Sequence, residues 1–202
     1  MKIRESGMPP KEYWDQFFNP ERLFRAFLQD QVLDGDGVEF GCGYGTFSFA
    51  ALQHLSGQLH ALDIEPDLVH QLKHQAIRQN QPRLKPKVVD FVSYGTQLPD
   101  ASQTLALIFN LLHLENPTAL LSEAFRILKP KGLVVLIHWR TDIPTPRGPS
   151  MAIRPTPQQC ETWLQQVGFE TIRHIDIHQA CPYHYGIGAN KPPQNASHAS
   201  LD

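Results

Sequence analysis

The sequence has few cysteines, no long run of apolar residues and almost no net charge. Its 202 residues include three cysteines, too few for a disulfide framework, so we expect reduced thiols and a cytoplasmic protein. No apolar stretch is long enough to cross a bilayer, and the first ten residues lack the apolar run of a secretory signal. The formal net charge of −2 supplies no overall attraction to nucleic acid or to a membrane. We therefore expect neither as a partner, and the oligomeric state stays open.

What the sequence does contain is a regular alternation of strand-like and helix-like segments. Such alternation predicts a doubly wound α/β fold with a mostly parallel sheet. The expected strands are 38–40, 58–64, 87–92, 104–109, 133–139, 171–177 and 183–187. The expected helices between them are 66–79, 117–128 and 158–167. The last two strands are joined by a short link, so they should form an antiparallel hairpin.

The chain reads as one domain over residues 1–189, and residues 190–202 are polar enough to predict a disordered tail. Within the domain, residues 1–33 form an N-terminal cap. Two short amphipathic helices are expected in it, separated at Asn19-Pro20.

One motif, VEFGCGYGT at residues 38–46, joins a strand to a helix. Glycines at Gly41, Gly43 and Gly45 allow a tight turn and a close approach of the backbone to a ligand. Glu39 precedes them by two residues, where a carboxylate would repel a pyrophosphate and attract a cationic amino group. This charge favours S-adenosylmethionine over a dinucleotide.

Asp63 ends the next expected strand, where an acid can accept hydrogen bonds from both hydroxyls of a ribose. Nicotinamide dinucleotide sites use the same acid, but their glycine pattern is G-x-G-x-x-G. The third glycine of that pattern would fall at Thr46. The motif and the acid together therefore predict a site for the methyl donor.

Residues 38–46, 62–66 and 110–132 resemble the class I S-adenosylmethionine-dependent methyltransferases, and are most similar to their small type 11 group. The resemblance covers about residues 36–188. It implies a Rossmann-like sheet of seven strands, in which an antiparallel seventh strand lies between the fifth and the sixth. N-terminal helices would precede this sheet.

The resemblance also implies a set of donor-binding residues: Glu39, Gly41, Gly43, Gly45, Asp63, Ile64, Asn110 and Leu111. The glutamate and the glycines would surround the methionine half, and Ile64 would pack on the adenine. Asn110 and Leu111 would lie near the sulfur. At Tyr94 the family often has an acid that accepts from the adenine amino group, so here stacking or backbone groups would hold the base.

Methyl transfer from a sulfonium leaves a neutral thioether and mainly requires that the reactants be positioned. It needs no metal, and His70 and His74 have no acidic or cysteine partners in register, so we expect none. A general base is needed only for a protonated nucleophile. His113 and His138 follow or end strands and are the candidate bases. The alternative is a helix-start or core-edge residue for His113 and a polar strand end for His138.

The acceptor site should lie between the N-terminal cap and the proline-rich loop after residue 139. Arg140, Arg147 and Arg154 in or near this loop suggest a small-molecule acceptor that carries a carboxylate or phosphate. The alternative is a solvated loop stiffened by proline. Tyr13 and Trp14 are candidate lid residues over the donor, or else residues of a helix that packs on the core.

Two other functions remain open from the sequence alone. The chain can be a non-catalytic module that binds S-adenosylmethionine as a sensor or partner subunit, because no residue is catalytic by pattern alone. A nicotinamide-dependent oxidoreductase is the second alternative, disfavoured by Glu39 and Thr46.

Overall fold

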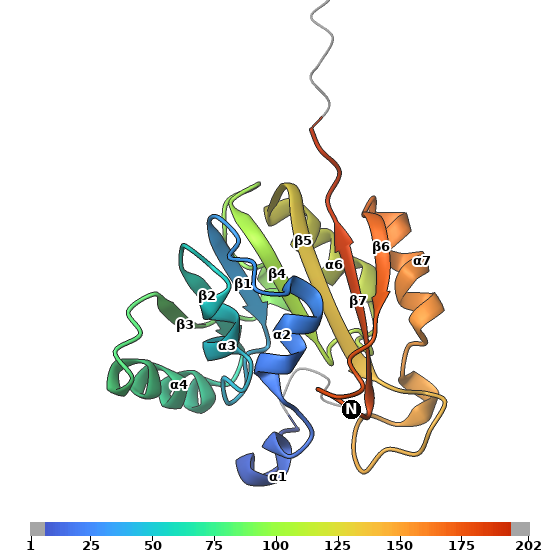
Figure 1. The fold of residues 1–202 in the computed structure, drawn as a ribbon, viewed down its shortest axis with the longest axis horizontal. Helices are drawn as coiled ribbons and strands as arrows, with labels where there is room; N and C mark the ends of the chain where they lie inside the picture. The colour runs from blue at the N-terminus through green and yellow to red at the C-terminus, as the bar shows by residue number, and fades with distance from the viewer. Residues whose placement is uncertain (1–6, 195–202) are drawn as a thin grey trace, which may run out of the picture.

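A computed structural model describes residues 7–194 and shows a seven-stranded sheet with helices on both faces (Figure 1). The strand order is β3-β2-β1-β4-β5-β7-β6. Only β7 is antiparallel to its neighbours, β5 and β6. The strands are β1 (Asp36–Phe40), β2 (Leu59–Asp63), β3 (Leu84–Val88), β4 (Gln103–Phe109), β5 (Leu128–Trp139), β6 (Glu170–Ile175) and β7 (His184–Asn190). The predicted α/β class, the parallel sheet and the final hairpin are confirmed.

Four of the described α-helices begin after a residue whose side chain caps the first turn. They are α1 (Lys11–Asp15), α2 (Pro20–Leu28), α3 (Ser48–Gln53), α4 (Pro66–Arg78), α5 (Phe91–Tyr94), α6 (Pro117–Ile127) and α7 (Pro157–Val167), with a 3-10 turn, η1 (Met151–Ile153). Asn19 and Asn116 accept from backbone N–H groups of the first turns of α2 and α6, and proline follows each of them. Proline fits there because its missing N–H would have no partner inside the helix.

Two hydrophobic cores lie on opposite faces of the sheet. One core joins α2, α3 and α4 to the sheet through residues such as Phe24, Ala51 and Leu72. The other joins α6 and α7 to it through residues such as Leu121 and Leu164. In the view of Figure 1, α2 and α3 lie in front of the sheet and α6 lies behind it. This three-layer arrangement leaves the carboxyl ends of the parallel strands as one edge on which a site can form.

Two predicted boundaries are wrong. The third strand spans Leu84–Val88 rather than 87–92, and residues 91–94 form α5. Pro86 lies inside this strand, and because β3 is an edge strand the missing N–H is tolerated.

The predicted disordered tail begins too early. Asn190 is the last residue of β7, and Lys191 donates to the carbonyls of Phe125 and Leu128. The rest of the predicted tail from residue 195 lies outside the described residues, as do residues 1–6 of the predicted cap.

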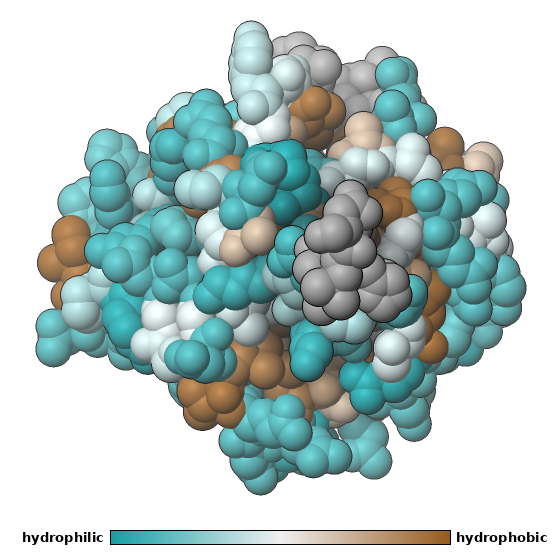
Figure 2. Space-filling model, turned by 90° about the horizontal axis from the view of Figure 1, so that it is seen from above, coloured by the Kyte–Doolittle hydropathy of each residue, from teal (hydrophilic) through white to brown (hydrophobic). Residues whose placement is uncertain are grey.

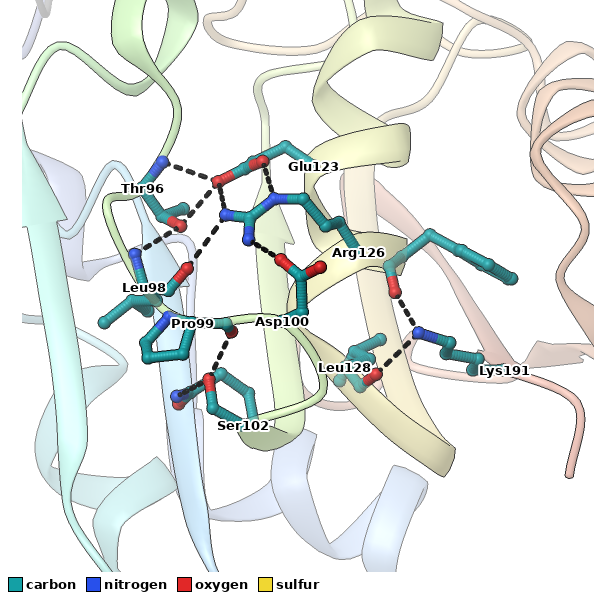
Figure 3. A network of polar contacts seen from close by, with 11 residues as sticks. Thr96, Leu98, Pro99, Asp100, Ser102, Glu123, Arg126, Leu128 and Lys191 are labelled. Atoms are coloured by element: carbon teal, nitrogen blue, oxygen red, sulfur yellow. Dashed lines mark hydrogen bonds and ion pairs between the residues drawn. The ribbon is translucent and has the colours of Figure 1, made fainter. Parts of the chain in front are cut away.

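A polar network fastens α6 to the loop before β4 (Figure 3). Arg126 donates to both carboxylate oxygens of Glu123, to the Leu98 carbonyl and to Asp100. The Thr96 backbone N–H and hydroxyl both donate to Glu123, each at 2.6 Å. These hydrogen bonds lower the pKa of Glu123 to about 2, against the effect of burial. Glu123 and Arg126 belong to the segment 110–132 that resembles the methyltransferases. The network gives both residues a structural role in holding α6 to the loop before β4.

The surface seen from above in Figure 2 is mainly hydrophilic, and the brown residues visible there form small, separate patches. Within residues 7–194, none of the helices is both long enough and apolar enough to cross a membrane.

Candidate active site

The glycine motif forms the turn between β1 and α3. Gly41, Gly43 and Gly45 have φ angles of 69°, 52° and 75°, values that side chains with a Cβ rarely adopt. A Cβ on Gly45 would lie 2.3 Å from the Leu72 side chain of α4. Gly41 and Gly43 line a cavity of about 330 Å³, whereas Gly45 packs against α4. Gly41 and Gly43 thus bring backbone to the cavity wall, as the spacing predicts.

The two acids of the motif differ in their surroundings. Asp63, at the end of β2, lines the cavity and accepts from the backbone N–H groups of Gly43 (2.8 Å) and Glu65 (3.0 Å). Glu39 is 2% exposed, does not line the cavity, and accepts from the Ser48 hydroxyl. Burial raises the pKa of Asp63, and it raises the pKa of Glu39 to about 8. The structure therefore places Glu39 within the fold next to the glycine loop, not on the cavity surface.

Asn110 follows β4 and is the clearest sign of a ligand. Its φ is 58°, and its backbone N–H donates to the Ile137 carbonyl of β5. Both polar atoms of its side chain are buried without a hydrogen-bond partner, and the residue lines the cavity. An unpaired buried amide costs about 1–3 kcal/mol, so its presence at a cavity wall indicates a polar partner that binds there. Ile64 and Leu111 line the same cavity.

Tyr94 is not part of the cavity, and this prediction is wrong. Its side chain is 76% exposed at the end of α5. Asp90, two residues after β3, lines the cavity instead and accepts from the Ser93 backbone N–H at 3.0 Å. The sequence carried a usable signal, since Asp90 follows the third strand directly once that strand is placed at Leu84–Val88.

The candidate bases are in contact with each other. His113 lines the cavity, and its Nδ1 lies 3.3 Å from Nε2 of His138, which is 1% exposed. Burial lowers the pKa of His113, and it lowers the pKa of His138 to about 3. Both rings are therefore neutral near pH 7. His113 lines the cavity, and His138 lies against it.

The three arginines do not act as a group. Arg140 forms a bidentate ion pair with Asp142 and does not line the cavity. Arg154 is 9% exposed and donates to the carbonyls of Pro149, Arg140 and Arg147 and to the Thr145 hydroxyl. It fixes the proline-rich loop and is no longer a candidate acceptor residue.

Arg147 is the arginine of the three that lines the cavity. It donates to the Gly7 carbonyl, and its guanidinium lies 6.0 Å from the centre of the Trp14 ring. The structure describes no carboxylate paired with it, within residues 7–194. Burial lowers its pKa, which is the effect expected of a cation removed from water without a counter-ion.

The N-terminal segment covers the glycine loop. Trp14 lines the cavity, next to Trp139 with ring centres 6.5 Å apart. Tyr13 is 40% exposed, does not line the cavity, and donates to the Pro146 carbonyl at 3.4 Å. Trp14 therefore lies at the cavity and its lid role stays a prediction, while Tyr13 joins α1 to the proline-rich loop. Sequence reasoning missed the cavity residues Phe47, Phe109 and Trp139, because nothing local marks them as more than core.

These residues fit S-adenosylmethionine by their chemistry. Asp63 has acceptors for hydroxyl groups, Asn110 has an unpaired donor and an unpaired acceptor, and the glycine turn provides a close backbone surface. Ile64 and Phe91 add apolar contact area along the same wall.

Comparisons with known proteins agree with this fit. Residues 38–132 match the family model described as a methyltransferase domain. A ubiquinone biosynthesis O-methyltransferase of Xanthomonas euvesicatoria pv. vesicatoria (strain 85-10) is 25% identical over 118 residues, which are 58% of this chain and 48% of that relative. The match thus spans about half the length of the curated relative.

Two solved structures share the fold over almost their whole length. A S-adenosylmethionine-dependent methyltransferase from Aquifex aeolicus superposes with a TM-score of 0.73 at 19% identity, over 94% of this chain and 97% of that one. A putative type 11 methyltransferase from Sulfolobus solfataricus gives 0.67 at 23% identity, over 91% and 98%. Residues 38–132 of the chain therefore match a methyltransferase domain, and the chain has the fold of these two methyltransferase structures.

Proposed function

We propose that this protein transfers a methyl group from S-adenosylmethionine to a small-molecule acceptor. The observation that carries the proposal is the unpaired, buried amide of Asn110 on the wall of a cavity that also contains Asp63 and the glycine turn. A buried polar group without a partner is rare in a folded protein, and a bound ligand at this edge of the sheet would satisfy it.

The proposed roles follow from position in the cavity. Asp63 holds the ribose hydroxyls, Ile64 and Phe91 contact the adenine, and Asp90 accepts from its amino group. Asn110, directly after β4, lines the cavity and contacts the methionine half. The bound donor supplies a methyl group on a sulfonium. The protein's contribution is to align the reactants and exclude water, which can lower a barrier by about 7–11 kcal/mol.

Thermal melting tests the donor site. S-Adenosylhomocysteine at 100 times its dissociation constant should stabilise the fold by about 2.7 kcal/mol, a rise in melting temperature of about 5–10 °C. Asn110→Ala and Asp63→Asn should each reduce this shift, while Asp67→Asn on the exposed side of α4 serves as the control. A shift with NADH and none with S-adenosylhomocysteine would instead support the oxidoreductase alternative.

We further propose that the acceptor is an anion held by Arg147. Of Arg140, Arg147 and Arg154, Arg147 lines the cavity. Among the described residues no carboxylate forms an ion pair with its guanidinium. Partial burial strengthens its attraction for a carboxylate or phosphate, because water screens the charge less. Trp14 and Trp139 beside it offer flat apolar surface for a planar molecule.

Benzoate is a suitable probe for this subsite, because it is planar and anionic. Titrated into the protein saturated with S-adenosylhomocysteine, it should bind more weakly to Arg147→Gln than to the wild type by about tenfold, the loss of one charged hydrogen bond. Arg140→Gln is the matched control, since Arg140 lies outside the cavity and is paired with Asp142. Equal benzoate affinity in all three proteins would refute the role of Arg147.

The non-catalytic alternative makes a different prediction. A sensor or partner subunit would bind the donor and release it unchanged. Incubation of the protein with S-adenosylmethionine and a metabolite extract should therefore yield S-adenosylhomocysteine only if the proposed activity is present. An inactive Asp63→Asn sample controls for contaminating enzymes.

A further inference from the structure

The two buried histidines form a pair whose proton positions can be deduced from their neighbours. Nδ1 of His113 lies 3.3 Å from Nε2 of His138, and the ring planes are 69° apart. His113 belongs to the turn after β4, and His138 is the penultimate residue of β5. Because β4 and β5 are adjacent and parallel, their carboxyl ends bring the two rings together. A hydrogen bond between two neutral imidazoles requires that one nitrogen donate and the other accept.

His138 is neutral near pH 7. It is 1% exposed, and the positive Arg154 and the rings of His113, His184 and Tyr185 surround it. Within residues 7–194 the polar contacts of this ring are to His113 and to the Trp139 carbonyl, and neither is a carboxylate. Both burial and the nearby cation therefore oppose a positive charge on His138, so exactly one of its nitrogens carries a proton.

The second neighbour of His138 fixes which nitrogen that is. Its Nδ1 faces the carbonyl oxygen of Trp139 at 3.5 Å. A carbonyl only accepts, so Nδ1 must carry the proton, and Nε2 is left as an acceptor. His113 must then donate to it from Nδ1. The remaining nitrogen of His113, Nε2, keeps its lone pair on the side of the ring away from His138, and His113 lines the cavity.

We propose that His113 is the general base of the methyl transfer, acting through Nε2 on an acceptor hydroxyl, and that His138 is a positioning residue that holds His113 in this tautomer. The proposal rests on the proposed function and narrows it to acceptors with a proton to lose. As the acceptor oxygen bonds to the methyl carbon, the carbon–sulfur bond breaks and its electron pair stays on sulfur. The acceptor's O–H bond breaks, and its proton moves to Nε2 of His113 and from there to water.

If the proton of His138 were on Nε2 and not on Nδ1, His113 could not act as a base through its own Nε2. If Nε2 of His138 carried the proton, Nδ1 of His113 would accept it and Nε2 of His113 would be an N–H donor. That arrangement would also leave two acceptors, Nδ1 of His138 and the Trp139 carbonyl, facing each other in a buried site. The two arrangements therefore differ in an observable property of the resting protein.

Nitrogen-15 NMR of the imidazole rings in the ligand-free protein distinguishes them. His113→Gln and His138→Gln assign the two sets of signals. The expected spectrum shows both rings protonated at Nδ1 and unprotonated at Nε2 at pH 7. Protonation of His138 at Nε2 would overturn the proposal. Because no ligand is added, the result is independent of whether the donor or an acceptor binds.

Variants at position 138 test the positioning role. His138→Leu removes the acceptor, so His113 should shift toward a mixture of tautomers, whereas the amide oxygen of His138→Gln can accept and should retain Nδ1–H. His70→Gln, at an exposed position on α4, should leave the His113 signals unchanged. An unchanged His113 tautomer in His138→Leu would overturn the positioning role. Stabilisation by S-adenosylhomocysteine in the same variants reports separately on the proposed donor site. If His138→Leu does not fold, the wild-type spectrum still tests which nitrogens of the two rings carry the protons.

Discussion

Glu39→Gln should stabilise the ligand-free protein, and the gain should grow with pH. Burial raises the pKa of Glu39 from 4.5 to about 8. Between these values the folded protein keeps a proton that the unfolded chain has lost, so wild-type stability falls as pH rises through this range. Glutamine is neutral at every pH, has nearly the same shape and can accept from the Ser48 hydroxyl as the carboxyl does. The stability of the variant therefore does not fall with rising pH through the titration of residue 39.

The size of the effect follows from the pKa difference. One pH unit between the two pKa values corresponds to about 1.4 kcal/mol. Relative to pH 4, the advantage of Glu39→Gln should reach about 2 kcal/mol at pH 6 and about 3 kcal/mol at pH 7, and level off at about 5 kcal/mol above pH 9. The direction of this trend does not depend on how well glutamine packs, because a packing difference is the same at each pH.

Reversible urea denaturation at pH 5, 6, 7 and 8 measures this difference. Glu170→Gln is the control, since Glu170 is exposed on β6, and it should show no such trend against the wild type. A stability difference for Glu39→Gln that stays constant with pH would refute the reasoning. It would mean that Glu39 loses its proton at the same pH in the folded protein as in the unfolded chain.

Three further predictions concern the scaffold. Gly45→Ala should destabilise the protein by about 2–4 kcal/mol, because position 45 has φ 75° and the new methyl would meet Leu72; an unchanged melting temperature would contradict this. Glu123→Gln should cost about 2 kcal/mol at pH 7, the usual value of a charged hydrogen bond. Because its folded pKa of about 2 lies below 4.5, this stabilisation exists above pH 4.5 and disappears as pH falls toward 2, so acid titration of wild type and variant should converge. Arg154→Met should free the proline-rich loop and speed trypsin cleavage after Arg147, and equal cleavage rates by mass spectrometry would argue against the role of Arg154.

The local features of the site could be predicted well from the sequence. The spacing of Gly41, Gly43 and Gly45 predicts a tight turn, and all three glycines have the positive φ angles of such a turn. Asp63 lies where the end of the second strand predicts it, on the cavity wall. Such predictions succeed because glycine spacing and strand ends act through the backbone within a few residues.

Predictions that required a side chain's surroundings were less successful. Arg140, Arg147 and Arg154 look alike in the sequence, but Asp142 pairs with the first and loop carbonyls accept from the last. Only the folded loop leaves Arg147 facing the cavity. Glu39 was expected at the ligand, and the packing of Ser48 against it places it inside the fold instead.

The sequence by itself determined the succession of strands and helices, the turn chemistry at their ends and the edge of the sheet at which the cavity lies. These depend on periodicity, capping and glycine or proline at particular positions, which are local properties of the chain. The tertiary structure alone decided which distant side chains meet. His113 and His138 are 25 residues apart, and they pair because β4 lies beside β5 in a fixed register. Strand order and register set such contacts, and the free energy that fixes them comes from packing across the whole sheet.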